Sequence, residues 1–341
     1  MINRKDISEV CDTEAESDLI FIMGIMQRSG TNYLNNLLLL HPDCEYPGFV
    51  WEDYLLAPAE YLDKYAKSVY NNWIPDWKTK LEETVGSNPL LRCLGEGLGL
   101  FFKKQFDGRR QLSGTKTQEE TSGYPTKLVT ATPSIKGIKY FFDLFPSACL
   151  LIIIRDGRSV IESGVKTFDW DYEYAMRRWR DAAQSILQFV QTAQGKRYLV
   201  VKYEDLCTDT NQEMTRILSF LGLDIKRYDF SAASNLTVVG SCEVRNSEGN
   251  IHWNPREKKS DFNPVNRWQY WGRPLHERFN WLVGESMKRS GYAILQYESY
   301  RTLWRLWNIV IDVLFNLEVW LLQRSLFLHN ILKRLRKALS R

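Results

Sequence analysis

The sequence has few of the residues that build metal sites, disulfide frameworks or strongly charged surfaces. Its six cysteines are scattered without a Cys-x-x-Cys pair, and its four histidines are far apart in the chain. We therefore expect free thiols and no bound metal. The 45 Lys and Arg residues nearly balance the 41 Asp and Glu residues, so the net charge is only +4. Charge of this size gives no reason to expect nucleic acid as a partner.

We also expect neither a secretory signal peptide nor a membrane span. The first eighteen residues are polar and acidic, whereas a signal peptide has a basic start followed by an apolar run. We expect no export through such a signal, and hence a cytoplasmic protein. The apolar stretch from Leu303 to Leu322 contains Asp312 and Glu318, each of which is costly at the centre of a bilayer. This stretch is therefore a poor transmembrane candidate.

What the sequence does contain is a repeated pattern of buried strand, loop and helix. Leu19–Gly24 and Cys149–Ile154 are short apolar runs, typical of strands buried on both faces of a parallel sheet. A helix is predicted over Tyr33–Leu40. A third strand is predicted over Arg197–Tyr203, followed by a helix that ends near Gly222. We expect an α/β fold with a P-loop-like parallel sheet flanked by helices, and ligands at the carboxyl ends of the strands.

The loop after the first strand, GIMQRSGT over residues 24–31, has the length of a Walker A phosphate-binding loop but not its residues. Ser29 takes the place of the second Gly, and Gly30 takes the place of the Lys, so an ATP site would lack its cation. Arg28 remains, and Asn32 lies in the first turn of a predicted helix whose free N–H groups and dipole favour an anion. We expect a phosphate-like or sulfate-like group here. The alternative is an ordinary turn with a surface Arg.

The loop after the second apolar strand contains another candidate for anion binding. Arg155 follows the strand directly, and Ser159 and Ser163 are four residues apart, so both share one face of the next helix. A guanidinium group binds two phosphate oxygens at once, and a hydroxyl adds a third bond. We expect a terminal phosphate at this loop. The alternative is an ion pair of Arg155 with Asp156 or Glu162.

Together the two loops resemble those of the sulfotransferase superfamily that uses 3′-phosphoadenosine-5′-phosphosulfate (PAPS). There, R/K-S-G-T after the first strand binds the 5′-phosphosulfate, and R-x₇-S after a later strand binds the 3′-phosphate. The matching residues are Arg28-Ser29-Gly30-Thr31 and Arg155 through Ser163, and RDGRSVIES looks like the protein-tyrosine enzymes. The resemblance covers residues 18–293. It implies a sulfotransferase that moves a sulfuryl group from PAPS to a hydroxyl or amine.

The resemblance also implies catalytic roles. Arg28 would hold the negative charge that grows during transfer. Glu52 would remove the proton of the acceptor, as a Glu in this region does in the protein-tyrosine and heparan-type enzymes. Glu45 and Asp53 are the alternative bases, and Glu52 could instead be an ordinary surface carboxylate. Lys116 resembles the lysine of heparan-type enzymes that approaches the transferring sulfate.

Further residues are implied at the PAPS site. Gln118 stands where the aryl and steroid enzymes have a catalytic His, which disfavours a small phenol or steroid acceptor. Tyr203 resembles a tyrosine near the adenosine, although core packing is an alternative role, and Ser241 lies in a segment that would close over PAPS. The expected PAPS-binding residues are Arg28, Ser29, Gly30, Thr31, Asn32, Arg155, Ser163, Tyr203 and Ser241.

Two other functions remain open at this point. A P-loop kinase or NTPase would need a Lys in the first loop and acidic metal ligands, and neither is evident. A non-catalytic nucleotide-binding protein would keep Arg28 and Arg155 but would lack a competent base. The acceptor is also open, since glycan, peptide tyrosine, lipid and small metabolite all fit.

Residues 300–341 form a predicted tail, after a polar segment over 1–17 and a sulfotransferase domain over 18–299. Polar residues recur every three or four positions from Arg301 to Asn316, opposite a wide apolar face. Basic residues without an acidic neighbour in sequence follow: Lys333, Arg334, Arg336, Lys337 and Arg341. This amphipathic, basic helical tail fits an anionic membrane surface. Packing on the catalytic domain and dimerisation through the same face are alternatives.

Overall fold

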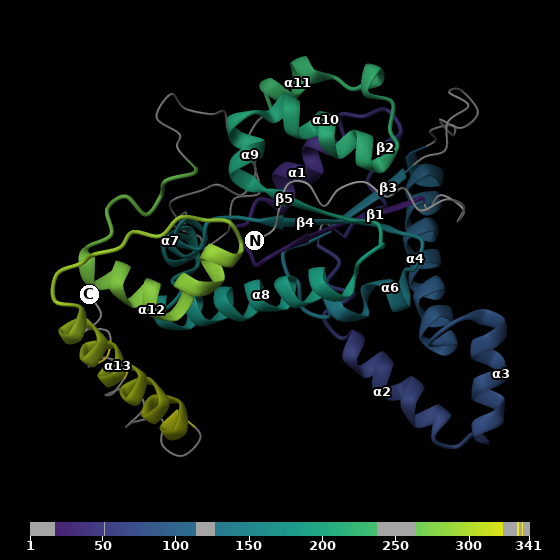
Figure 1. The fold of residues 1–341 in the computed structure, drawn as a ribbon. Helices are drawn as coiled ribbons and strands as arrows, with labels where there is room; N and C mark the ends of the chain where they lie inside the picture. Colours follow the sequence, from purple (N-terminus) through teal and green to yellow (C-terminus); the bar gives the residue numbers. More distant parts are fainter. Residues whose placement is uncertain are drawn as a thin grey trace.

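The computed structural model describes residues 18–50, 52–113, 127–236 and 264–322, together with Lys333 and Arg336. This part of the chain forms three layers, in which a parallel sheet lies between two groups of helices (Figure 1). The sheet has the strand order β2-β3-β1-β4-β5, and every neighbouring pair is parallel. Its strands are β1 Leu19–Gly24, β2 Cys44–Glu45, β3 Lys127–Thr132, β4 Cys149–Ile154 and β5 Tyr198–Lys202. The predicted α/β class is confirmed.

The two apolar runs of the sequence form central strands. β1 and β4 begin and end where predicted, and every residue of both is buried. β5 is one residue shorter at each end than the strand predicted over 197–203. The apolar pattern does not predict β3, because Lys127, Thr130 and Thr132 interrupt it, although the sheet buries the whole strand. Its place beside β1 depends on long-range pairing, which local periodicity does not reveal.

One face of the sheet is covered by helices that follow β1 and β5. They are α1 Thr31–Leu38, α9 Tyr203–Thr208, α10 Thr210–Leu221 and α11 Phe230–Ser234, with the short 3-10 helix η2 Ile225–Arg227. Ile20 and Ile22 of β1 belong to the hydrophobic core on this side. α10 ends as predicted at Gly222, whose φ of 70° allows the N–H of Leu223 to reach the carbonyl of Leu218 at 3.0 Å.

The opposite face is covered by a second group of helices. They are α4 Pro89–Ser113, α6 Phe141–Leu144, α7 Gly157–Phe168, α8 Tyr172–Thr192 and α12 Arg273–Arg289, with the 3-10 helix η1 Ile138–Tyr140. The ring of Phe21 in β1 lies 4.6–5.7 Å from the rings of Phe102, Phe141 and Phe145. Two helices, α2 Ala59–Tyr70 and α3 Pro75–Val85, extend away from the sheet beyond α4 (Figure 1).

The helix α13 Arg301–Leu322 projects from the lower left of Figure 1 and packs against α8 and α12. Its carboxylates face inward. Asp312 Oδ1 lies 2.6 Å from Nη2 of Arg278, and Glu318 Oε2 lies 2.7 Å from Nε of Arg336. The predicted amphipathic helix is present, but its polar residues Asn308 and Asp312 contact the domain together with the buried Ile311 and Phe315. The expectation that Arg336 belongs to a free cationic end is wrong, because Arg336 is buried and paired.

A search of the described helices for a membrane span finds none of sufficient length and apolarity. This agrees with the interpretation of α13 as a poor transmembrane candidate. The boundaries at residues 17 and 299 stay predictions.

Candidate active site

The loops that follow β1, β4 and β5 meet at one edge of the sheet. β4 lies between β1 and β5, and all three run in the same direction. The register places Gly24 beside Ile153 and Ile154 beside Lys202. The two loops expected to bind anions therefore lie side by side, because parallel strands present their following loops at the same edge.

The loop after β1 folds tightly at two glycines. Gly30 has a φ of 100° and directly precedes α1. A Cβ atom on Gly30 would lie 2.2 Å from the ring of Tyr203, and one on Gly24 would lie 2.4 Å from Ser29 Oγ. Any larger residue at these positions would force the loop apart. The backbone can therefore approach a bound anion closely, as phosphate-binding loops do.

The N-terminus of α1 offers hydrogen-bond donors at this loop. The helix begins at Thr31, and within the described part of the chain no side chain caps it. Free N–H groups and the positive end of the helix dipole both favour an anion. Ser29 Oγ, just before the helix, is buried and has no hydrogen-bond partner among the described residues. A buried hydroxyl without a partner is costly, and a bound oxyanion would satisfy it.

Three arginine side chains gather around the two loops. Arg28 donates from Nε to the buried Ser163 Oγ of α7 at 2.9 Å, and Arg267 donates from Nη1 to the same oxygen at 3.3 Å. Arg155 donates from Nη1 to the carbonyl oxygen of Arg28 at 2.6 Å. The loops are thus joined directly, and the guanidinium groups concentrate positive charge at this edge of the sheet.

Arg155 is held by neutral groups in the described part of the chain. Besides the carbonyl of Arg28, its guanidinium contacts the carbonyl of Pro264 and lies 4.3 Å from the ring centre of Tyr203. Its Nε is buried without a described hydrogen-bond partner. These contacts orient the side chain without an ion pair, although the carboxyl of Glu204 lies nearby, where burial raises its pKa and the charge of Arg155 opposes part of that rise. The guanidinium keeps hydrogen-bond donors for an anion.

The carboxylates that could have paired with Arg155 have other partners. Asp156 binds Arg158, with Oδ2 at 2.5 Å from Nη2. Glu162 accepts hydrogen bonds from the hydroxyl of Tyr172 and the indole N–H of Trp271, both at 2.7 Å. The alternative of an Arg155 ion pair with either carboxylate is therefore wrong for this structure.

Sequence reasoning assigned no role to Arg267, which the fold brings to the site. The segment over residues 264–268 lies across the second loop, where Ser159 donates to the carbonyl oxygen of Val265. Arg267 thereby reaches Ser163 across 104 positions of sequence. The surrounding segment has little periodicity, so the local sequence pattern does not mark this residue.

Tyr203 is a core residue in contact with the site. Its ring is buried among the apolar side chains that cover the α1 side of the sheet, and burial raises the pKa of its hydroxyl. One part of the ring packs against Gly30, and its face lies under the guanidinium of Arg155. Tyr203 therefore positions both loops, while its expected contact with adenosine stays a prediction.

Glu52 is connected to the first loop through hydrogen bonds. The hydroxyl of Tyr54 donates to Glu52 Oε2 at 3.1 Å and accepts from Nε2 of Gln27, the neighbour of Arg28, at 3.5 Å. Burial raises the pKa of Glu52, and the hydrogen bond from Tyr54 opposes part of that rise. A half-buried carboxylate of raised pKa beside an anion site has the properties of a general base.

The two alternative bases are engaged elsewhere. Glu45 accepts hydrogen bonds from Arg109 at 2.9 Å and from Arg110 at 2.8 Å. Asp53 accepts one from Thr130 Oγ1 at 2.6 Å and another from a backbone N–H at 2.9 Å. Burial raises the pKa of Asp53 as well, so the direction of the pKa shift does not separate it from Glu52. Geometry favours Glu52, because its hydrogen bonds among the described residues reach Gln27 in the first loop.

Two expected site residues lie outside the described residues. Lys116 falls in 114–126 and Ser241 in 237–263, so their roles stay predictions. Within the described ranges no three His, Cys, Asp or Glu side chains gather as a metal site would require. Metal independence also stays a prediction.

The region around both loops matches a known protein family. A family model described as the sulfotransferase family matches residues 19–227, more than half of the chain. The match includes the loops after β1, β4 and β5. The chain belongs to the sulfotransferase family. The family predicted from the two loops is confirmed.

Two curated relatives of this sulfotransferase carry the name protein-tyrosine sulfotransferase. The chain is 32% identical to protein-tyrosine sulfotransferase A of Caenorhabditis elegans over 97 residues, which is 26% of each protein. It is 30% identical to the protein-tyrosine sulfotransferase of Drosophila melanogaster over 95 residues, 26% of this chain and 19% of the relative. The chain thus matches about a quarter of the first relative's length and about a fifth of the second's.

Solved structures also align with this sulfotransferase. The sulfotransferase domain of the olefin synthase of Synechococcus covers 84% of this chain and 98% of its own length, with a TM-score of 0.49 and 19% identity.

Proposed function

We propose that this sulfotransferase transfers a sulfuryl group from PAPS to a hydroxyl or amine acceptor and releases adenosine 3′,5′-bisphosphate. The observation that carries the proposal is the meeting of Arg28, Arg155 and Ser163 at the carboxyl ends of β1 and β4. A nucleotide with anionic groups on both sides of its ribose needs two neighbouring cationic sites, and each loop supplies one.

The first loop suits the 5′-phosphosulfate. The N–H groups that open α1 and the buried hydroxyl of Ser29 can donate to its oxygens. Arg28 can stabilise the negative charge that collects on the bridging oxygen as the sulfur–oxygen bond breaks. Bound PAPS would supply the activated sulfuryl group, and these residues would hold it in line with the acceptor.

The second loop suits the 3′-phosphate. Arg155 has a buried Nε without a described partner, and the stacked Tyr203 keeps its guanidinium in a defined plane. Ser163 presents a buried hydroxyl to the same region, between Arg28 and Arg267. A phosphate among these groups would be bound by charge-assisted hydrogen bonds, the stronger class in proteins.

Glu52 is the proposed base. As the acceptor oxygen or nitrogen forms its bond to sulfur, its proton would move to the Glu52 carboxylate. The relatives' names make peptide tyrosine the first acceptor to test. Glycans, lipids and small metabolites belong in the same panel, because acceptor loops vary among enzymes that share nucleotide loops.

A thermal unfolding experiment separates this function from that of a kinase or NTPase. Adenosine 3′,5′-bisphosphate should raise the melting temperature, whereas ATP with magnesium should not, because a ligand stabilises only the fold that binds it. Protection by ATP alone would favour the phosphotransferase. Radiolabel transfer from PAPS to a panel acceptor separates an enzyme from a non-catalytic nucleotide-binding protein.

Arg155→Ala should weaken adenosine 3′,5′-bisphosphate much more than adenosine 5′-phosphate, since only the former has the phosphate that Arg155 would bind. Loss of a charge-assisted contact costs about 1.5–3 kcal/mol of binding free energy. Isothermal titration of both nucleotides measures the difference.

The matched control is Arg180→Ala on α8, whose guanidinium pairs with the exposed Asp181 at 2.7 Å. It should leave both affinities unchanged. Equal weakening of both nucleotides by Arg155→Ala would remove Arg155 from the 3′ site and indicate that it acts only by supporting the first loop through the carbonyl of Arg28.

A further inference from the structure

Helix α13 turns its carboxylates inward and most of its apolar side chains outward, although Ile311 and Phe315 are buried. Six exposed apolar residues, here called the α13 stripe, recur at steps of three and four: Leu303, Leu306, Val310, Val313, Leu317 and Trp320. Asn308 and Glu318 are buried on the opposite side. A surface helix of a globular protein normally has the reverse arrangement, with its apolar stripe toward the core.

Buried ion pairs maintain this orientation. Arg278 of α12 is 1% exposed, and its guanidinium binds Asp312 together with Glu173 of α8. It also donates to the side-chain oxygen of Asn308 at 3.1 Å. Rotating α13 to bury the stripe would separate Arg278 from Asp312 and Asn308, at the high cost of breaking a buried ionic contact. These contacts of Arg278 therefore keep the apolar face of α13 exposed in the folded protein.

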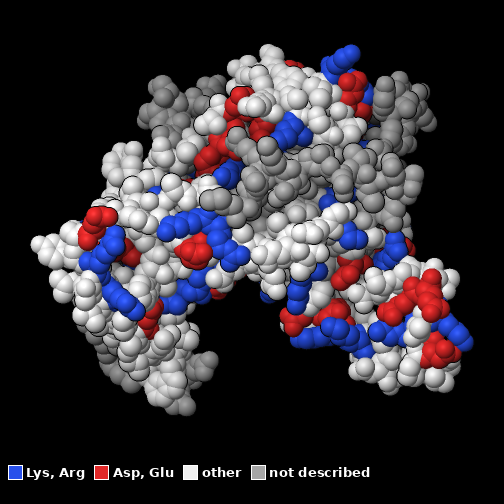
Figure 2. All heavy atoms as spheres, viewed as in Figure 1, with Lys and Arg blue, Asp and Glu red and all other residues white. Residues whose placement is uncertain are grey.

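The exposed face is wide, and the charges beside it are cationic. At about 100° per residue, the exposed apolar positions from Ile309 round to Leu303 cover roughly 120° of the helix surface. The exposed charged residues of α13 are Arg301 and Arg305. In Figure 2 the visible lower part of the helix shows no charged side chain among its described atoms. With Ile309 beside the six residues of the α13 stripe, this face is wider than the strict seam of a coiled coil.

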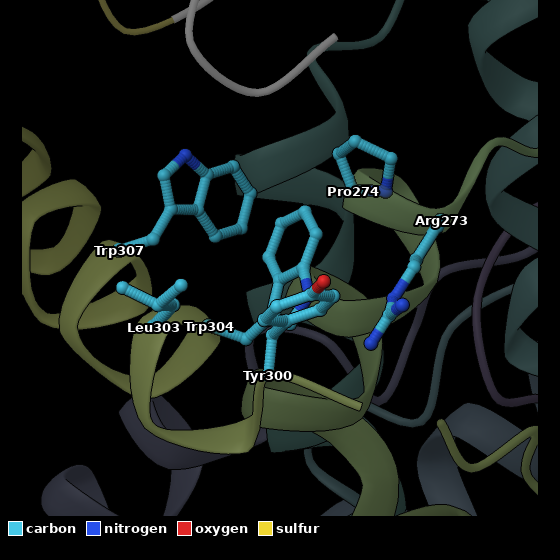
Figure 3. Close-up of a pocket in the computed structure, with 6 residues that line it drawn as sticks. All are labelled: Arg273, Pro274, Tyr300, Leu303, Trp304 and Trp307. Atoms are coloured by element: carbon cyan, nitrogen blue, oxygen red, sulfur yellow. The ribbon is translucent and has the colours of Figure 1, made fainter. Parts of the chain in front are cut away.

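An aromatic hollow adjoins the first turns of the helix. Leu303, Trp304 and Trp307 line it together with Tyr300, and Arg273 at the start of α12 faces them from the other side (Figure 3). Its volume is about 460 Å³. Indole and phenol rings beside a guanidinium combine apolar area with polar donors, a composition typical of residues at the boundary between water and lipid.

We propose that the α13 stripe docks this protein on the surface of an anionic lipid bilayer, with the helix lying in the plane of the interface. The stripe enters the boundary between headgroups and acyl chains, and Arg301 and Arg305 meet anionic headgroups. A second copy of the chain is a poorer occupant. In a two-fold symmetric pairing of α13, Arg305 of each helix would meet no exposed carboxylate of α13, while Arg301 already pairs with Glu298 at 3.4 Å.

The test compares two double variants in vesicle sedimentation. Leu306→Glu with Val313→Glu places charge on side chains that are 56% and 53% exposed. The control, Leu100→Glu with Val85→Glu, makes the same changes at residues of α4 and α3 that are 52% and 37% exposed. Vesicles of phosphatidylcholine alone and of equal parts phosphatidylcholine and phosphatidylglycerol separate neutral from anionic surfaces.

We expect the full chain to sediment with the anionic vesicles and to release at high salt, because counterions screen the arginines. The α13 variant should lose roughly tenfold or more of this partitioning, since its carboxylates oppose both the apolar and the anionic part of the surface. The control should bind as the wild type does. Melting temperature and binding of adenosine 3′,5′-bisphosphate report that each variant is folded.

Three outcomes would overturn the proposal. The wild type could ignore anionic vesicles at low salt, or the α13 variant could bind them as well as the wild type. Light scattering could instead show a dimer that Leu306→Glu with Val313→Glu converts to a monomer while vesicles have no effect, and the stripe would then be a contact between copies. Each outcome is independent of whether the protein transfers sulfate.

Discussion

Replacing Glu52 by Gln is expected to slow sulfuryl transfer by roughly 10²–10⁴-fold, because the amide keeps the shape of the side chain but cannot take the acceptor's proton. Binding of adenosine 3′,5′-bisphosphate should be unchanged, since Glu52 reaches the first loop only through Tyr54 and Gln27. Single-turnover transfer from radiolabelled PAPS and titration of the nucleotide measure the two quantities separately.

The matched control for this variant is Glu60→Gln. Glu60 is an exposed carboxylate of α2 that pairs with Lys64 at 2.7 Å, so its loss should leave the transfer rate unchanged. A wild-type rate in Glu52→Gln, with Asp53→Asn or Glu45→Gln inactive instead, would show that another carboxylate is the base.

The pH dependence of transfer tests the surroundings of Glu52. Burial raises the pKa of this carboxyl, and a base acts only when it is deprotonated. The rate should therefore rise with pH through a pKa above the ordinary value for Glu and then level off. Tyr54→Phe removes a hydrogen bond that stabilises the carboxylate, so the rising limb should move to higher pH. If the rate of Tyr54→Phe rises over the same pH range as that of the wild type, the Tyr54 hydrogen bond does not affect the pKa of the base.

Arg278→Met is expected to lower the free energy of unfolding by about 3 kcal/mol or more, since breaking a buried ionic contact leaves charge without full compensation. Its guanidinium lies 2.5 Å from Glu173 Oε1 and 2.6 Å from Asp312 Oδ1, and both carboxylates keep Arg177 as a second partner. Because Arg177 still pairs with both carboxylates, the loss of unfolding free energy should be close to about 3 kcal/mol. Urea denaturation followed by tryptophan fluorescence measures it.

Arg180→Met is the control on stability, because its pair with Asp181 is at the surface and should contribute about 1 kcal/mol or less. If Arg278→Met lowers the free energy of unfolding as little as Arg180→Met does, the buried ion pairs of Arg278 contribute no more to stability than a surface pair. Detachment of α13 alone would appear instead as proteolysis near residue 300 without a change in the main unfolding transition.

Acidification adds a second test of this cluster. Burial alone would raise the pKa of Asp312, but hydrogen bonds from Arg278 and Trp281 outweigh it and hold this pKa below its ordinary value. A carboxyl whose pKa is lower in the folded protein contributes stability above its unfolded pKa, and that contribution is lost as the pH falls through the folded pKa. The difference in free energy of unfolding between wild type and Arg278→Met should therefore become smaller below a pH of about 4.

Much of the candidate site could be read from local sequence. Residues 24–31 and Arg155 through Ser163 are short motifs that directly follow strands, so predicting the strands also placed the motifs at one edge of the sheet. The choice among Glu45, Glu52 and Asp53 could not be made this way. It depends on partners such as Arg109, Thr130 and Gln27, which lie in distant parts of the chain.

The sequence by itself determined the α/β class, the limits of β1 and β4, and the positions of the two loops expected to bind anions, because each rests on a continuous apolar run or a motif within a few neighbouring residues. It also predicted that the tail from residue 300 contains an amphipathic helix, which the structure shows over Arg301–Leu322. Only the tertiary structure decided which side of that helix faces the domain. Periodicity shows that a helix has two faces, but the buried guanidinium of Arg278, contributed by another helix, holds Asp312 and Asn308 inward and leaves most of the apolar face outside.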